Sequence, residues 1–162
     1  LFRDILALGN LRKPELLERL LRALALQVGS AVSLNELSNL LGVDKATVGT
    51  YLELLEKAYV VFRLPTFSRH QRNEIKNGRK VFFYDNGIRN AIIQNLTPFD
   101  FRTDKGALWE NFLISERMKV LAYHGQLSRT GFWRTAQQQE VDFLEERNGT
   151  LNAFEFKWKH KS

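Results

Sequence analysis

Cysteine is absent from the 162 residues, and proline (3 residues) and methionine (1 residue) are scarce. Without cysteine, disulfide scaffolds, thiolate metal sites and cysteine nucleophiles are excluded. Long apolar runs are also missing, since the longest, at 58–62 and 81–84, fall far short of the roughly 18 residues of a membrane helix. No signal or transit segment is visible, so we expect a cytoplasmic location and no membrane partner.

The composition nevertheless favours a folded chain. Hydrophobic residues make up 44% of the sequence and aromatic residues 12%, which is enough for packed cores and excludes global disorder. The chain begins at Leu1 rather than at an initiator methionine, so we expect it to be a piece of a longer protein.

Positive charge is concentrated in one short segment. The net charge is +6, yet residues 1–62 contain seven basic and seven acidic side chains. Residues 63–80 contain six basic side chains against one glutamate, a local net charge of +5. The basic residues are Arg63, Arg69, Arg72, Lys76, Arg79 and Lys80. Such clustering predicts a polyanionic partner.

The first half of the chain predicts a winged helix-turn-helix domain over residues 1–96. Apolar residues recur at helical spacing over 14–28, and Ser33 with Glu36 forms a capping box for a second helix that ends at Gly42. Asp44 can cap a third helix over 45–58. Two β-rich segments, 59–64 and 80–84, flank the basic loop and predict the wing; Asp85 can then cap a helix over 87–95.

The second half predicts a separate domain over residues 106–162, after a linker at 97–105 that lacks sustained periodicity. A helix is expected over 106–123, followed by strands over 130–135, 140–146 and 150–158. Asn148-Gly149 is a strong signal for a two-residue hairpin turn. The overall class is therefore α+β. The three tryptophans, at positions 109, 133 and 158, are interpreted as core residues.

The hairpin turn fixes which residues lie opposite each other. With a two-residue turn, opposed residue numbers sum to 297, so Asp142 lies opposite Glu155 and Glu140 opposite Lys157, all on one face. Two opposed carboxylates repel, and a divalent cation between them would reverse the sign of the interaction. The alternative is a solvated sheet face on which Lys157 and Glu140 form an exposed ion pair.

These residues resemble the PD-(D/E)XK nuclease superfamily, in which a helix glutamate, a strand aspartate and an acidic-x-Lys motif meet around Mg²⁺. The resemblance implies that Glu110, Asp142 and Glu155 are catalytic metal ligands and that the carbonyl of Phe156 adds a further ligand. It implies that Lys157 assists the attacking water. The second domain would then be a partial restriction-endonuclease-like α/β domain, truncated at its C-terminus because only five residues follow Lys157.

The chain as a whole resembles the C-terminal region of prokaryotic AAA-type ATPases that end in a domain of unknown function. The matching motifs begin at Ser33 (SLNEL), Thr47 (TVGTYLELL), Lys80 (KVFFYDNG), Gly106 (GALWEN), Phe132 (FWRT) and Glu140 (EVDF). The resemblance implies an upstream ATPase domain as a partner, with ATP bound only there, because these residues contain no G-x-x-x-x-G-K-[ST] motif.

Two groups of residues are predicted to bind nucleic acid, with DNA as the expected partner. Lys45, Thr47 and Thr50 lie off the apolar face of the third helix, where a DNA-reading helix presents its side chains. The wing would contact phosphates through Arg69, Arg72, Lys76, Arg79 and Lys80. For the helix the alternative is non-specific contact or a scaffold role. For the wing it is a solvated loop or a surface that docks onto an acidic ATPase neighbour.

The sequence therefore predicts a winged helix that binds nucleic acid, followed by a nuclease-like Mg²⁺-dependent phosphodiesterase site. The alternative function is a non-catalytic regulatory or assembly module that mediates protein-protein contacts of the ATPase.

Overall fold

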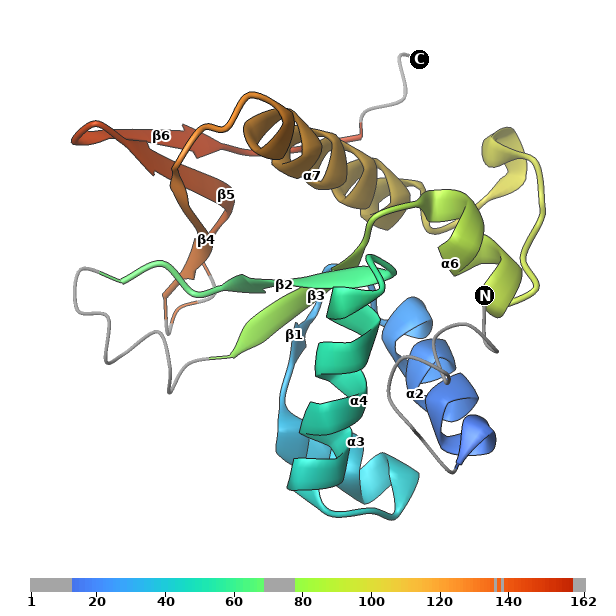
Figure 1. Ribbon diagram of the computed structural model, residues 1–162. Helices are drawn as coiled ribbons and strands as arrows, with labels where there is room; N and C mark the ends of the chain where they lie inside the picture. Colours follow the sequence, from blue (N-terminus) through green and yellow to red (C-terminus); the bar gives the residue numbers. More distant parts are fainter. Residues whose placement is uncertain (1–12, 69–77, 136, 138, 159–162) are drawn as a thin grey trace.

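The computed structural model describes residues 13–68, 78–135, 137 and 139–158 of the chain. These residues form five α-helices, a short 3-10 helix and two three-stranded antiparallel sheets, which confirms the α+β class (Figure 1). Among the described residues, none of the helices combines the length and the apolar character needed to cross a bilayer.

The first part of the chain contains three helices in close succession. Helix α2 (Pro14–Leu26) is followed by β1 (Ala31–Val32), α3 (Leu34–Leu41) and α4 (Lys45–Lys57). The predicted caps are confirmed: the side chain of Ser33 accepts from the backbone N–H of Glu36, and the side chain of Asp44 accepts from Thr47. The three helices bury a leucine-rich core between them.

A small sheet adjoins these helices. Strand β2 (Val61–Pro65) and strand β3 (Arg79–Phe83) are antiparallel, and the short β1 pairs with the other edge of β3, which gives the order β1-β3-β2. The sequence pattern did not predict β1, which is only two residues long. Helix α6 (Asn86–Ile92) follows, and its first turn is capped by the side chain of Asp85, as predicted.

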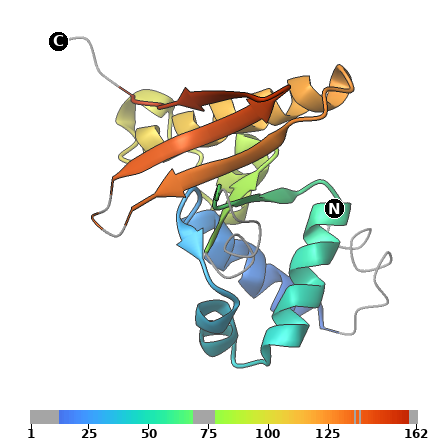
Figure 2. The ribbon, with the colours of Figure 1, turned by 90° about the vertical axis from the view of Figure 1, so that its left-hand side faces the viewer.

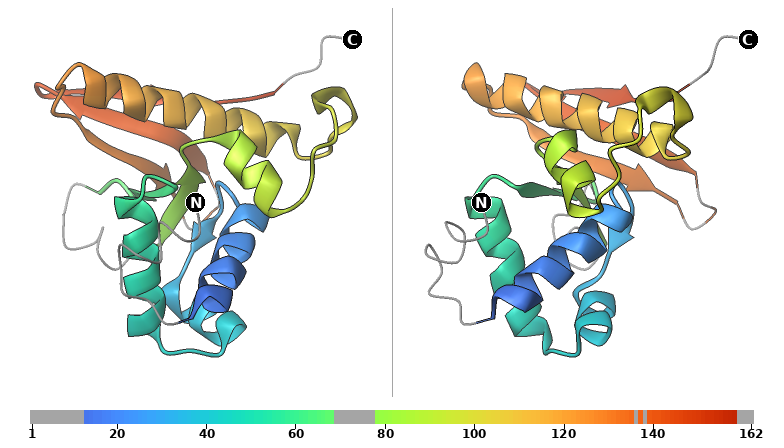
Figure 3. Two further views of the ribbon diagram at one scale, coloured as in Figure 1. Left: turned by 45° about the vertical axis from the view of Figure 1, so that its right-hand side comes forward. Right: turned by 90° about the vertical axis from the view of Figure 1, so that its right-hand side faces the viewer.

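The second sheet belongs to the C-terminal part of the chain. After the 3-10 helix η1 (Phe99–Phe101) and the long helix α7 (Lys105–Tyr123), strands β4 (Arg129–Arg134), β5 (Glu140–Arg147) and β6 (Thr150–Phe154) pair in sequence order. Figure 2 shows this sheet in front of α7. The two views in Figure 3 show α7 running along the sheet, on the side toward α6.

The predicted register of the last hairpin is confirmed, but its length is not. Pairs from Arg147–Thr150 to Phe143–Phe154 all sum to 297, and both turn residues, Asn148 and Gly149, have positive φ as a tight turn requires. The strand predicted to reach residue 158 ends at Phe154. The reason is that the backbone N–H of Phe156 donates to the carboxylate of Asp142 (2.7 Å) instead of continuing the ladder.

One buried core extends through both halves. Ile114, Phe132 and Phe143 belong to the same apolar cluster as the leucines of the first three helices. The amide of Asn111 on α7 is fully buried and hydrogen-bonds both backbone groups of Phe83, at 2.8 and 3.0 Å. The backbone N–H of Phe67 donates to the carbonyl of Phe132 (2.6 Å), which joins the end of the β2 segment to β4. The predicted linker is thus not the only connection between the two halves.

Candidate functional site

A buried lysine lies where the two sheets and α7 meet. The Lys80 side chain is 4% exposed, and its Nζ lies 3.1 Å from Oε1 of Glu110 and also forms an ion pair with Glu140. The ring centroid of Phe132 lies 5.3 Å from Nζ. Lys80 was predicted to be a wing residue that contacts phosphates, but its ammonium group makes internal contacts instead. We call Lys80, Glu110 and Glu140 the buried ion cluster.

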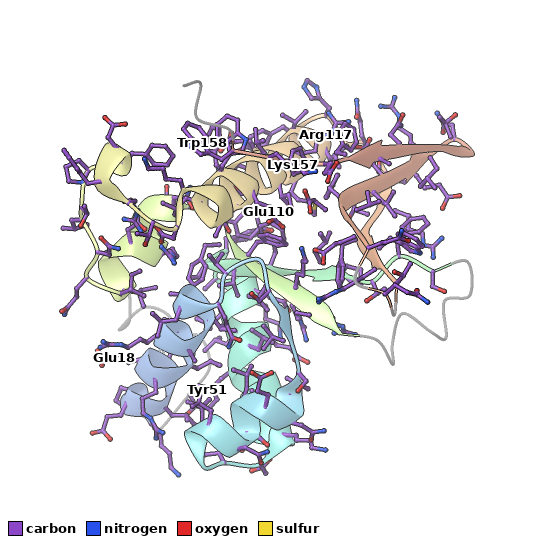
Figure 4. The ribbon with its side chains drawn as sticks, turned by 180° about the vertical axis from the view of Figure 1, so that it is seen from behind. Glu18, Tyr51, Glu110, Arg117, Lys157 and Trp158 are labelled. Carbon is purple, nitrogen blue, oxygen red and sulfur yellow. The ribbon has the colours of Figure 1, made fainter. Side chains whose placement is uncertain are left out.

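Local structure explains why these three residues converge. In the middle strand β3, Lys80 is paired with Ala31 on one side and with Leu64 on the other, so its backbone is enclosed. Glu110 directly precedes Asn111, whose side-chain amide hydrogen-bonds the backbone N–H and carbonyl of Phe83 and so fixes the rotation of α7. In Figure 4, Glu110 lies on the side of α7 that faces the first sheet, whereas Trp158 lies above the helix.

A β-bulge places Glu140. The register of β4 against β5 shifts between Gly131 and Trp133, so that Gly131 opposes Leu144 while Trp133 opposes Val141. One extra residue on β5 reverses the alternation of faces beyond the bulge. Val141 consequently shares an apolar pocket with Leu144, and the carboxylate of Glu140 is turned toward Lys80.

Burial and charge both act on the cluster. Burial lowers the pKa of Lys80, but the attraction of Glu110 and Glu140 outweighs it, so that the pKa lies above its ordinary value. Burial raises the pKa of Glu110; Lys80 opposes this, while repulsion from Asp142 and Glu140 adds to it, and the net shift is upward. Lys80 therefore stays charged at neutral pH, as the internal counter-ion of the cluster.

The remaining predicted site residues lie differently. Asp142 accepts from the N–H of Phe156, whose side chain packs against the core. Glu155 and Lys157 pair with each other at 2.7 Å, and their side chains are 57% and 64% exposed. The pKa of Lys157 is raised by its hydrogen bond to Glu155. Glu155 thus lies beyond the last strand pair, where its carboxylate is in solvent rather than opposite Asp142 in the sheet.

The described residues do not fit a magnesium ion. Among them, no group of three or more histidine, aspartate or glutamate side chains is arranged to hold a metal. The two carboxylates that do converge, Glu110 and Glu140, have the ammonium of Lys80 between them.

The residues predicted to bind nucleic acid are only partly described. Lys45 is exposed and Arg79 is half-buried, whereas Arg69, Arg72 and Lys76 lie outside the described residues. The hydroxyls of Thr47 and Thr50 donate within their own helix, to the carboxylate of Asp44 (2.7 Å) and to the carbonyl of Ala46 (3.0 Å).

The structure also contains an aromatic pocket that the sequence analysis missed. It has a volume of about 500 Å³ and lies between α6, η1, the start of α7 and the C-terminal segment. Its apolar lining residues are Leu96, Phe99, Leu108, Trp109, Phe112 and Trp158. Trp158 is 40% exposed and contacts the rings of Phe99 and Trp109, so its interpretation as a core residue is wrong, as is that of Trp133, which is 41% exposed.

A buried charge network supports one wall of this pocket. Asp104 accepts from Arg102 at 2.7 and 2.8 Å and from Arg89, and both guanidinium groups are buried. The hydrogen bonds from Arg102, opposed by burial and helped by Arg89, hold the pKa of Asp104 well below its usual range. Arg89 also donates to the carbonyl of Ala25 (2.8 Å), which ties the predicted linker to α2.

Comparison with known proteins gives two matches to family models. Residues 1–98 match the family described as Domain of unknown function (DUF8612), and residues 105–162 match Domain of unknown function (DUF4143). No solved structure matches the chain.

Curated relatives are longer than this chain. Uncharacterized proteins of Mycobacterium bovis and Mycobacterium tuberculosis are each 28% identical over 157 residues, which cover 96% of this chain and 35% of the relative. An uncharacterized protein of Haemophilus influenzae is 26% identical over 146 residues, 87% of this chain and 34% of its own. The chain thus spans about a third of the length of these relatives.

Proposed function

This chain belongs to the family described as Domain of unknown function (DUF8612), and we propose that it binds nucleic acid, with DNA as the preferred partner, as one part of a longer protein. The observation that carries the proposal is the β2/β3 hairpin: its paired strands and the residues between them include the segment 63–80, in which the chain's positive charge is concentrated.

The order of elements supports a winged helix. Helix α2, strand β1, helices α3 and α4 and the β2/β3 hairpin follow one another as in a helix-turn-helix with a wing. The four residues between α3 and α4 include Gly42 in the left-handed conformation and Asp44 as the cap of α4. The exposed face of α4 carries Lys45, Thr50 and Glu53, which together provide little positive charge. We therefore propose that α4 lies close to the nucleic-acid backbone and that the wing provides most of the affinity.

Salt dependence tests the wing. Each phosphate neutralised on a duplex contributes about 0.9 to the slope of log affinity against log salt. We expect the triple variant Arg69→Ala, Arg72→Ala, Lys76→Ala to lower this slope by about 3, measured by fluorescence anisotropy with a labelled DNA duplex and, in parallel, with the RNA duplex of the same sequence.

The matched control removes the same charge from α2. Arg19 and Arg22 on α2 and Lys13 directly before it are exposed, and their triple alanine variant should leave the slope unchanged. Equal losses in the two triple variants would show that only net charge matters, and a flat response of the unmodified chain to salt would refute phosphate binding altogether.

Phosphodiester cleavage rests on the resemblance alone, because the described side chains do not fit a metal. Its test compares Mg²⁺-dependent cleavage by the chain with that by Lys157→Ala. Cleavage lost in the variant would establish a catalytic site. Equal cleavage by both, or none by either, would leave binding as the function.

Assembly is a second candidate function, favoured by the aromatic pocket. Phe99, Phe112 and Trp158 are each about 40% exposed beside one another, and such apolar surface is typical of a contact site in a larger protein. An assembly module of an AAA-type ATPase would bind its own upstream region. We expect Phe112→Ala to weaken that association, measured by titration calorimetry, whereas the exposed Tyr123→Ala on the same helix should not.

A further inference from the structure

We propose that Lys80 is the built-in cation of the acidic cluster and that it keeps this cluster from binding a divalent metal. The proposal does not depend on nucleic-acid binding, since the residues that would contact phosphate lie elsewhere.

The contacts of the ammonium group carry the argument. Carboxylates from two elements far apart in sequence, Glu110 on α7 and Glu140 on β5, both form ion pairs with Nζ of Lys80 on β3. The ring of Phe132 covers a further side. The side chains of Glu110 and Glu140 are 19% and 25% exposed, against 4% for the lysine. The second oxygen of Glu140 also pairs with the exposed Arg134 (3.5 Å), so among the described residues Lys80 is the buried cation on which both carboxylates converge.

A metal ion cannot be added to this arrangement; it has to replace the lysine. Mg²⁺ and Mn²⁺ need oxygen ligands at about 2.0–2.2 Å. An ion held at that distance by both carboxylates would occupy the space that Nζ fills, 3.1 Å from Oε1 of Glu110. Displacement would also leave an ammonium group buried against Phe132 with no partner, which is strongly unfavourable.

The lysine has a further advantage over an ion from solution, because it is tethered. A tethered group acts at an effective concentration set by its short connection, and Lys80 is held in the central strand of the first sheet. Millimolar metal therefore does not compete. The same tether makes the cluster a connection between β3, α7 and β5 that needs no cofactor.

Removing the ammonium should open the cluster. We expect Lys80→Met to bind Mn²⁺ at least about tenfold more tightly than the unmodified chain, measured by titration calorimetry. The matched control Lys157→Met removes an exposed lysine that also pairs with a glutamate, and it should behave like the unmodified chain. Adding Glu110→Gln to Lys80→Met should abolish the gain. Affinities within threefold for the unmodified chain and a folded Lys80→Met would overturn the proposal.

A second measurement needs no variant, so it remains decisive if Lys80→Met fails to fold. Acetylation of the unmodified chain with a limiting reagent, analysed by peptide mass spectrometry, should label Lys157 and spare Lys80. Millimolar Mn²⁺ should change neither result. Increased labelling of Lys80 in Mn²⁺ would mean that the metal displaces it, and this would overturn the proposal.

Discussion

Asn111 is the residue at which the junction of the two halves can be tested most directly. Its Oδ1 accepts from the N–H of Phe83 (2.8 Å), and its Nδ2 donates to the carbonyl of Phe83 (3.0 Å) and to Oδ1 of Asn86 (2.9 Å). The side chain is fully buried. Asn111→Leu keeps the volume nearly constant but leaves three polar groups without partners.

The cost follows from these three groups. A buried donor or acceptor left without a partner costs about 1–3 kcal/mol. Asn86 is half-exposed, so part of its loss can be recovered by hydrogen bonds to water. We therefore expect Asn111→Leu to lower the free energy of unfolding by about 4 kcal/mol. Urea unfolding followed by circular dichroism measures this. The control Asn152→Leu, on the exposed face of β6, should change the free energy by less than about 0.5 kcal/mol.

Asn111→Asp separates hydrogen bonding from packing. The carboxylate retains the acceptor for Phe83 but repels two oxygens that the amide formerly donated to. Its protonated form can donate to one of them, so the loss of stability should be smaller near pH 4 than at neutral pH. A loss below about 1 kcal/mol for Asn111→Leu, or one equal to that of Asn152→Leu, would refute the role of this amide.

Three further predictions concern other connections. We expect Asp104→Asn to lower the free energy of unfolding by about 3 kcal/mol at neutral pH. Because the pKa of Asp104 is lowered, its contribution to stability is present above the ordinary carboxyl range and is lost as pH falls through the lowered value. In urea unfolding, the stability of the variant should therefore vary less with acid pH than that of the unmodified chain. We expect Gly131→Ala to lower the free energy of unfolding by about 2 kcal/mol, since its Cβ would lie 2.8 Å from a backbone oxygen of the first sheet. The control Gly49→Ala, at a helical site with open space around it, should stabilise the chain by about 0.5–1 kcal/mol, and thermal melts measure both. Arg117→Met leaves Glu145, 2% exposed, without its two hydrogen bonds, and we expect it to lower the free energy of unfolding by about 2 kcal/mol; a free energy equal to that of the unmodified chain would contradict this explanation.

Local features of the fold could be predicted from sequence because their causes are local. Ser33, Asp44 and Asp85 cap helices, since each side chain reaches a backbone N–H three residues ahead. Asn148-Gly149 set the hairpin register because both residues tolerate positive φ. The end of β6 was missed, because it depends on a side chain, Asp142, that takes the place of a strand partner.

The candidate site depended on contacts that no local pattern encodes. Lys80 precedes Glu110 by 30 residues and Glu140 by 60, and in sequence it is one more basic residue of the predicted wing. Its burial follows from its place in the middle strand, which in turn depends on the two-residue strand β1. The bulge that turns Glu140 inward leaves no signal in the alternation of β5. The one available clue is that Lys80 directly precedes a continuous apolar run, Val81 to Tyr84, of the kind that fully buried strands contain.

The narrow gap at Gly131 has a mechanical consequence. There the second sheet approaches the base of the β2/β3 hairpin so closely that a Cβ would meet Pro65 and Phe67, and the Phe67–Phe132 backbone bond lies beside it. The Phe67–Phe132 bond and the contact at Gly131 therefore attach the end of the β2 segment directly to β4, so that a displacement of Phe67 reaches the second sheet without passing through the residues between α6 and α7.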